Sequence, residues 1–276
     1  MFGVGLSLSV TDFTRIIRFP KPFFTALTVQ MIGLPMVAFA IQLLLSPLPD
    51  AVRVGFVILS ACPGGATSGF LAYLWKGNVA LSLSITSVNS FITLFSIPLI
   101  TNMGLLVFMD QSTDLHLPFW DTIRHIFSIA ILPALFGIAI RNQFPLVADK
   151  FNKPARYVML VLLALVFTFK ITLGESQGGS GLTWKDFAYI TPFALLQNAS
   201  CLLLGYFVMK WMGFDHPSRL TAAMESGVQN TTLAFLITSN MLHNPQMIKP
   251  ALIYSIYSFW TACLFAWISN KKNSVT

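Results

Sequence analysis

Charged side chains are scarce in this sequence. Only 10% of its 276 residues are Asp, Glu, Lys or Arg, whereas 55% are apolar and the mean hydropathy is +0.72. Soluble domains carry about 25% charged residues, so this composition excludes an ordinary soluble domain. No polar, Pro/Ser-rich or low-complexity stretch is longer than a loop. We therefore expect one integral membrane unit over residues 1–276.

Cysteine and catalytic motifs are also sparse. The three cysteines, Cys62, Cys201 and Cys263, lie in apolar segments, and an odd number of buried thiols is not a disulfide framework. No spacing of His and Cys resembles a zinc site, and the sequence has no Gly-x-Ser-x-Gly motif. It therefore predicts neither a transition-metal site nor an enzyme.

Long apolar stretches dominate what is present. Each is long enough for a helix that crosses a bilayer, which takes about 20 residues. Residues 1–10 are apolar but too short to span, and they lack the positive start and cleavage site of a signal peptide. The eight predicted spans lie near 22–46, 51–73, 79–108, 118–141, 155–174, 186–210, 218–240 and 249–269.

Basic and acidic residues alternate along the loops between these spans. Twelve of the 17 Lys and Arg residues belong to one set of loops: Arg15, Arg18, Lys21, Lys76, Arg141, Lys150, Lys153, Arg156, Lys210, Arg219, Lys271 and Lys272. The opposite loops carry Asp50, Asp110, Asp114, Glu175 and Asp186. The positive-inside rule makes the basic loops and the C-terminus cytoplasmic. The net charge of +7 thus fits a multi-pass membrane protein with this orientation and does not require a nucleic-acid partner.

Glu225 is the one acidic residue deep inside an apolar stretch. A carboxylate at membrane depth costs about 2.5 kcal/mol or more unless a partner compensates its charge. No basic residue lies within the same stretch. A bound cation is the simplest partner, which predicts a transporter; a proton carried by the carboxyl group is the alternative.

Two of the predicted spans are interrupted in a similar way. The second contains Cys62-Pro63-Gly64-Gly65, and the seventh contains Gly227 within the polar segment 224–232. Pro and paired Gly leave backbone groups without helical partners, which is tolerated at membrane depth only inside protein or beside a wet cavity. The breaks lie five spans apart and so run through the membrane in opposite directions, as in an inverted repeat. A Pro kink and an unrelated Gly packing contact are the alternative.

A weaker correspondence supports the repeat. Pro22 and Phe23 precede Gln30 in the first span, and Pro192 and Phe193 precede Gln197-Asn198 in the sixth. Inverted repeats favour an alternating-access transporter over a channel, because channels usually repeat their filter by oligomerisation.

These motifs resemble those of the bile acid:sodium symporter family. The matching segments run through the chain in order: Met1 to Phe13, Cys62-Pro63-Gly64-Gly65 with Ser68, residues 73–82, and Glu225-Ser226-Gly227-Val228-Gln229-Asn230. The resemblance implies an all-α fold of two five-helix inverted repeats, with two crossed discontinuous helices. A core domain would come from about 22–108 and 186–269, and a panel remnant from about 1–21 and 118–174. The family's first helix and half of its second have no counterpart here, so we expect the natural start to lie upstream.

The resemblance also implies two sodium sites, and Na⁺ as the coupling ion. The first would use Ser68, Ser82, Thr86 and Glu225, although the family's Asn after the serine is Gly69 here. The second would use Gln30, Glu225 and Gln229, with main-chain carbonyls near Ser226 and Val228. Taken singly, Ser82 and Thr86 could bond back to the preceding helical turn, and Gln30 could bridge two helices.

The implied substrate is a small organic anion, taken up together with sodium by alternating access. Asn230 matches a position that lines the family's substrate cavity, and Gly65, Ala66 and Thr67 would offer N–H groups at a half-helix N-terminus. Two transport alternatives remain: proton-coupled anion transport, and an arsenite-type efflux carrier of the same fold that would use Cys62. The sequence identifies neither the anion nor the oligomeric state.

Overall fold

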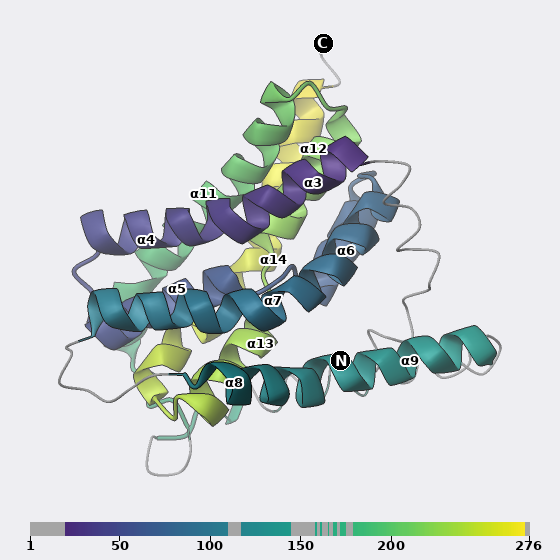
Figure 1. The fold of residues 1–276 in the computed structure, drawn as a ribbon. Coiled ribbons are helices and arrows are strands. Elements are labelled where there is room, and N and C mark those ends of the chain that lie inside the picture. The colour runs from purple at the N-terminus through teal and green to yellow at the C-terminus, as the bar shows by residue number, and fades with distance from the viewer. Residues whose placement is uncertain are drawn as a thin grey trace.

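The computed structural model describes residues 20–109, 117–144 and 179–273, together with positions 158, 161, 165, 168–169 and 172–174. Its named elements are all helical within these ranges (Figure 1). The first half contains α3 (Pro20–Thr28), η2 (Val29–Gly33), α4 (Leu34–Leu44), α5 (Asp50–Ala61), α6 (Ala66–Leu74), α7 (Val79–Phe108), α8 (Phe119–Ile126), η3 (Phe127–Ile131) and α9 (Leu132–Gln143). The second half contains α11 (Trp184–Trp211), α12 (His216–Gly227), α13 (Thr231–Leu236), η5 (Ile237–Met241) and α14 (Pro245–Asn273).

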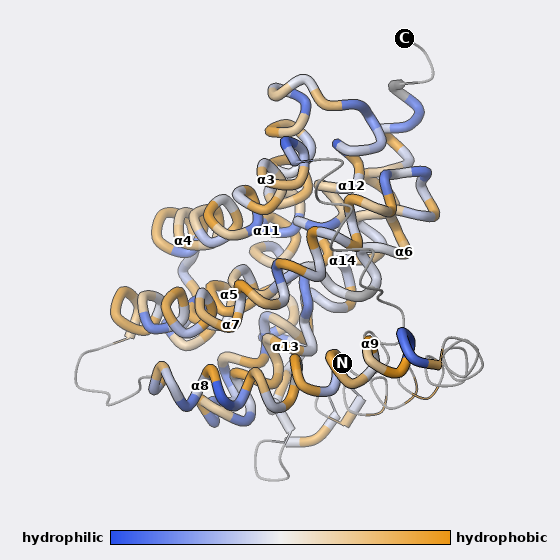
Figure 2. Tube along the Cα trace, turned by 45° about the vertical axis from the view of Figure 1, so that its right-hand side comes forward, coloured by the Kyte–Doolittle hydropathy of each residue, from blue (hydrophilic) through white to orange (hydrophobic). Residues whose placement is uncertain are grey.

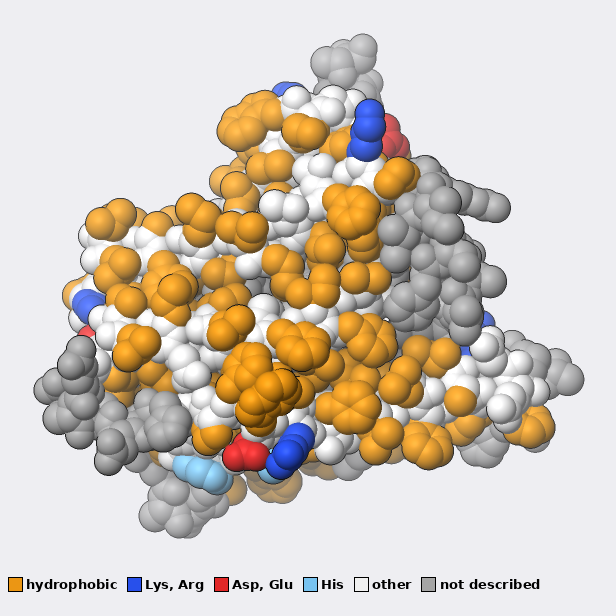
Figure 3. Space-filling model, in the orientation of Figure 1, with side chains coloured by type: hydrophobic (Ala, Val, Ile, Leu, Met, Phe, Trp, Pro, Cys, Tyr) orange, Lys and Arg blue, Asp and Glu red, His pale blue; other side chains and the backbone are white. Residues whose placement is uncertain are grey.

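Within the described residues, five continuous helices are long and apolar enough to cross a membrane. They are Pro20–Leu44, Val79–Phe108, Phe119–Gln143, Trp184–Trp211 and Pro245–Lys271. Each coincides with a predicted span, which confirms an all-helical polytopic membrane protein. Hydrophobic residues run along most of the helix length (Figure 2). In Figure 3 hydrophobic side chains are spread over much of the described part of the visible face, and the charged side chains lie near its edges.

Two further predicted spans are each divided into short helices. The span near 51–73 consists of α5 and α6, and the span near 218–240 consists of α12, α13 and η5. The interruptions fall at 62–65 and 228–230, where the sequence places them. The predicted span near 155–174 and the segment 1–10 lie wholly or mostly outside the described residues. The total number of spans and the core-and-panel layout stay predictions.

Close helix packing surrounds the two divided spans. Helix α5 lies between α7 and α14, and nine of its residues are buried. A Cβ at Gly55 would overlap the main-chain oxygen of Met247 in α14. A Cβ at Gly205 in α11 would lie 2.6 Å from the Ala222 oxygen in α12. Small residues therefore let these backbones approach closely, as is common between membrane helices.

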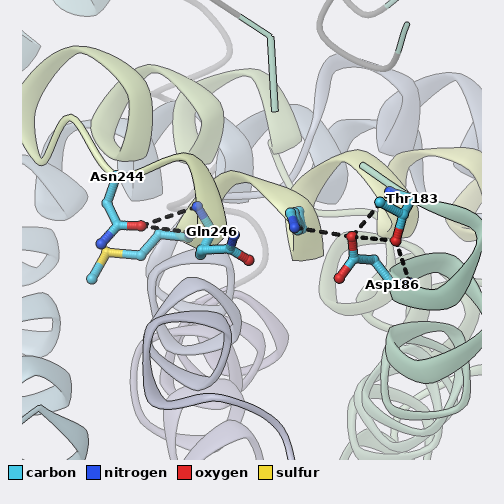
Figure 4. A network of polar contacts seen from close by, with 6 residues as sticks. Thr183, Asp186, Asn244 and Gln246 are labelled. Carbon is cyan, nitrogen blue, oxygen red and sulfur yellow. Dashed lines mark hydrogen bonds and ion pairs between the residues drawn. The ribbon is translucent and has the colours of Figure 1, made fainter. Parts of the chain in front are cut away.

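An ion pair joins the starts of α11 and α14 (Figure 4). The Lys249 Nζ donates to Asp186 Oδ2 at 3.0 Å, and the lysine side chain is only 4% exposed. The same carboxylate completes a capping box, because it accepts from the Thr183 N–H and hydroxyl. Asn244 caps α14 beside it, since its Oδ1 accepts from the Gln246 N–H at 3.0 Å. Thr183, Asp186 and Asn244 thus fix where the two helices begin, and Lys249 joins them.

Removing the carboxylate and removing the ammonium group of this ion pair are expected to destabilise the protein by unequal amounts. Asp186→Asn leaves a buried ammonium without its carboxylate and weakens the cap, so we expect a loss of about 1–3 kcal/mol. Lys249→Met leaves an aspartate that is 29% exposed in its side chain and still capped, so its loss is about 1 kcal/mol or less. Thermal unfolding in detergent measures the order of the two variants. Equal losses, or the reverse order, would contradict this assignment.

Candidate cation site at the crossing of two broken helices

The two helix breaks lie side by side and satisfy each other's backbone groups. The Gly65 N–H donates to the Val228 oxygen at 2.7 Å, and the Asn230 N–H donates to the Pro63 oxygen at 2.8 Å. Gly64 and Gln229 form an isolated antiparallel bridge between these bonds. A buried backbone group without a partner is costly. Each break therefore stabilises the other, although they are far apart in sequence.

Glycine is required at the crossing because other groups lie against it. A Cβ at Gly64 would overlap Oε2 of Glu225, and a Cβ at Gly65 would lie 3.2 Å from the Gln229 oxygen. At Gly227, a Cβ would overlap the side chain of Leu202 in α11. The sequence signals these glycines as helix breakers, and the structure shows that they also make room for the carboxylate and the crossing backbone.

Three hydroxyl groups surround the buried carboxylate of Glu225. Ser68 Oγ lies 2.7 Å and Ser82 Oγ 2.5 Å from Oε1, while Thr86 Oγ1 lies 2.8 Å from Oε2. Glu225 is 1% exposed. The structure thus brings together the four residues predicted for the first sodium site. None of the three hydroxyls bonds only to its own helix.

The Ser68 hydroxyl lies close to two acceptor oxygens but has only one proton to donate. Its Oγ lies 2.6 Å from the Gly65 oxygen and 2.7 Å from Glu225 Oε1, yet a hydroxyl has a single proton to donate. The second of these oxygen pairs needs a positive charge or a proton from elsewhere. Among the described residues, no Lys, Arg or His forms an ion pair with Glu225. A small cation among these oxygens would meet both needs.

Buried amide groups lie next to this cluster. Gln30, in η2, lies beside the Glu225 carboxylate, and its Nε2 has no hydrogen bond of normal length. Gln229 is buried at the crossing, and neither of its amide atoms has a partner. Buried polar atoms without partners are rare in native proteins. Gln30 and Gln229, the two amides predicted for the second sodium site together with Glu225, thus both carry buried polar atoms without partners.

The donor chemistry of the cluster fits a hard cation such as Na⁺. Carboxylate, hydroxyl, amide and main-chain oxygens are all present, and these are the ligands that hard cations prefer. In the part of the chain that the structure describes, no three His, Cys, Asp or Glu side chains gather in the way a transition metal requires. Gly69 supplies no side-chain oxygen; a Cβ there would lie 3.3 Å from Ser82 Oγ.

The remaining predicted residues lie near the crossing without forming a recognisable anion site. The Val228 carbonyl, predicted as a sodium ligand, accepts from Gly65; the Gly65 N–H, predicted for the substrate, is the donor in that bond. Asn230 is half-buried, and its Oδ1 accepts from the Leu233 N–H as the cap of α13. Three further predicted positions are placed as follows: Ala66 begins α6, Thr67 is exposed in its first turn, and Ser226 is buried in the last turn of α12.

Sequence reasoning missed a second set of contacts to the α12 break. The Gly227 oxygen accepts from Asn198 Nδ2 at 2.7 Å and from the Tyr254 hydroxyl at 2.8 Å. Thr261 Oγ1 in turn donates to Asn198 Oδ1. Asn198 is recognisable as an amide within an apolar span, whereas nothing in the sequence singles out Tyr254 or Thr261. These side chains from α11 and α14 satisfy a carbonyl that the helix break leaves free.

Long apolar helices around a buried, oxygen-lined carboxylate define the class of this protein as a membrane transporter. The model of the sodium bile acid symporter family matches residues 1–176. The chain belongs to this family, whose members are transporters and not enzymes.

The names of three similar proteins all refer to sodium-dependent transport or cotransport. The "Uncharacterized sodium-dependent transporter YocS" of Bacillus subtilis is 27% identical over 99% of this chain and 81% of its own length. The "Ileal sodium/bile acid cotransporter" of Oryctolagus cuniculus is 26% identical over 97% of this chain and 76% of its own. The "Probable sodium/metabolite cotransporter BASS2, chloroplastic" of Oryza sativa subsp. japonica is 28% identical over 92% of this chain. The chain spans 58% of the length of that rice protein.

Proposed function

We propose that this protein is a sodium-coupled symporter that takes up a small organic anion by alternating access. The observation that carries the proposal is the Glu225 carboxylate, which is buried at the helix crossing among hydroxyl oxygens from α6 and α7. The relatives named as sodium cotransporters support the choice of ion. The membrane would be a bacterial inner membrane, with the C-terminus in the cytoplasm.

Sodium would be held by the residues that already meet around Glu225. Ser68, Ser82, Thr86 and Glu225 would form one site, and Gln30 and Gln229 would join Glu225 in the other. Bound Na⁺ supplies the positive charge that the carboxylate lacks. The hydroxyls would then tie α6 and α7 to α12 through oxygens shared with the ion, which stabilises one arrangement of the crossed helices.

Anion binding would follow from the same crossing. The starts of α6 and α13 lie at the two breaks, and helix N-termini favour negative charge. Thr67, in the first turn of α6, and Asn230, the cap before α13, are the candidate side chains, because both are at least partly accessible. The environment of Cys62 favours organic-anion transport over arsenite transport, since its thiol is buried and donates to the Ile58 oxygen. By linkage, sodium and anion raise each other's affinity by the same factor.

Uptake into proteoliposomes tests this function. The purified chain is reconstituted and given an inward gradient of Na⁺, of K⁺ or of protons, with labelled cholate or pyruvate as probes for a bile acid and a small keto acid. We expect accumulation of at least one anion only with the Na⁺ gradient. Equal uptake under K⁺ would refute sodium coupling, and uptake that follows the proton gradient alone would establish a proton carrier instead.

A further inference from the structure

Asn89 is a fully buried amide that neither the sequence motifs nor the family resemblance assigns to the site. It lies on α7, seven residues after Ser82 and three after Thr86, so the three side chains share one face of the helix. It is 0% exposed. Its Nδ2 donates to Gln30 Oε1, and its Oδ1 has no partner. A polar side chain thus continues the row of oxygens that begins at the carboxylate.

Exchanging the oxygen and nitrogen assignments of the two amides does not remove the unpartnered oxygen. As placed, the Gln30 Nε2 lies beside Glu225 without a hydrogen bond of normal length, and the Asn89 Oδ1 has no partner. Exchanging oxygen and nitrogen in both side chains keeps the bond between them, but then the Gln30 oxygen lies beside the Glu225 carboxylate without a donor. In either arrangement one buried amide oxygen of this pair has no proton to accept. A buried acceptor of this kind costs about 1–3 kcal/mol.

We propose that Asn89 is a further ligand of the bound cation, supplying its side-chain carbonyl oxygen together with Gln30 and Gln229. This inference rests on the proposed sodium coupling and extends it to a residue outside the predicted sites. The cation takes the place of the missing hydrogen-bond donor, which would account for a buried amide oxygen without a protein partner at this position. Gln30 links the two parts of the site, because it contacts Asn89 and lies beside the Glu225 carboxylate.

Sodium titration of the detergent-purified chain tests the proposal without requiring transport. Thermal unfolding is followed as NaCl replaces choline chloride at constant ionic strength, which gives the Na⁺ concentration for half-maximal stabilisation. For Asn89→Leu we expect this concentration to rise at least about tenfold, equivalent to about 1.4 kcal/mol. Asn89→Ala, which cannot overfill the site, is expected to behave alike and guards against a folding defect. Unchanged half-saturation in both variants would overturn the proposal.

Asn102→Leu is the matched control on the same helix. Asn102 donates to the Leu117 oxygen and accepts from the Leu117 N–H, so both of its amide atoms anchor a neighbouring segment. Its loss should lower the unfolding temperature and leave the Na⁺ half-saturation unchanged. A tenfold rise in this control too would show that the loss of either amide on α7 has the same effect, and would overturn the assignment to Asn89.

A double variant separates a ligand from a residue that only orients Gln30. If Asn89 acts through Gln30, Asn89→Ala adds nothing in a Gln30→Ala background, whereas a ligand gives a further loss of sodium affinity. We expect the further loss. Its absence would overturn ligation by Asn89 while leaving sodium coupling intact. A wild-type chain that NaCl does not stabilise would instead overturn the proposed function, and this inference with it.

Discussion

Glu225→Gln is expected to abolish sodium-dependent stabilisation and uptake. The substitution keeps the size of the side chain but removes the one negative charge among the three hydroxyls of Ser68, Ser82 and Thr86. It also introduces an N–H₂ group where the hydroxyl protons now point, so at least one hydroxyl loses its acceptor. We expect the Na⁺ half-saturation to rise at least about 100-fold, equivalent to about 2.7 kcal/mol. Titration of thermal unfolding with NaCl, followed by uptake in proteoliposomes, provides the two measurements.

The fold itself should survive this change, because the crossing depends on backbone bonds that the side chain does not make. The Gly65 and Asn230 N–H groups donate to main-chain oxygens of the opposite break. Removing an uncompensated buried charge relieves a desolvation cost, so without sodium the variant should unfold at or above the wild-type temperature. A variant that is less stable in choline chloride, or one that still responds to millimolar Na⁺, would contradict the role given to Glu225.

The sequence contained enough information to locate the crossing, because its signals are chemical and local. Pro63 with paired glycine, and Glu225 in an apolar stretch, are unusual at membrane depth whatever the fold. The contacts between them depend on how segments 139–157 residues apart pack, which local patterns do not encode. Tyr254 illustrates this limit, because nothing in its span marks it, yet it donates to the Gly227 oxygen. Asn89 is visible as an amide in an apolar span, but its bond to Gln30 depends on how two helices pack.

The crossing is similar in backbone on its two sides but different in chemistry. Gly64 pairs with Gln229, so Ser60, four residues before Gly64, corresponds to Glu225, four residues before Gln229. Ser60 donates to the Val57 oxygen in its own helix, and its neighbour Leu59 belongs to the apolar core. The hydroxyl and carboxylate oxygens at the crossing therefore gather around Glu225 and not around Ser60.

Gly64→Ala is expected to disable the site as severely as the loss of the charge. The added methyl group would overlap Glu225 Oε2 and lie 3.3 Å from Ser68 Oγ, so the carboxylate must turn away from Ser68, Ser82 or Thr86. We expect the Na⁺ half-saturation to rise at least about 100-fold, or about 2.7 kcal/mol. Gly104→Ala is the packing control, since a Cβ there would lie 3.0 Å from Val57 Cγ1 in a purely apolar contact. It should lower the unfolding temperature without changing the response to sodium.

A compensating substitution distinguishes a displaced carboxylate from a damaged crossing. Glu225→Asp shortens the side chain by one methylene group and withdraws the carboxylate from Gly64, and alone it should weaken sodium binding because the hydroxyl contacts lengthen. In the Gly64→Ala background the same shortening makes room for the new methyl group, so the double variant should bind Na⁺ more tightly than Gly64→Ala alone. The effect of Glu225→Asp on Na⁺ affinity should therefore have opposite signs in the two backgrounds, as expected for two coupled residues in contact. If Glu225→Asp weakens binding equally in both backgrounds, the two side chains do not compete for the same space, and the geometry inferred for the carboxylate is wrong.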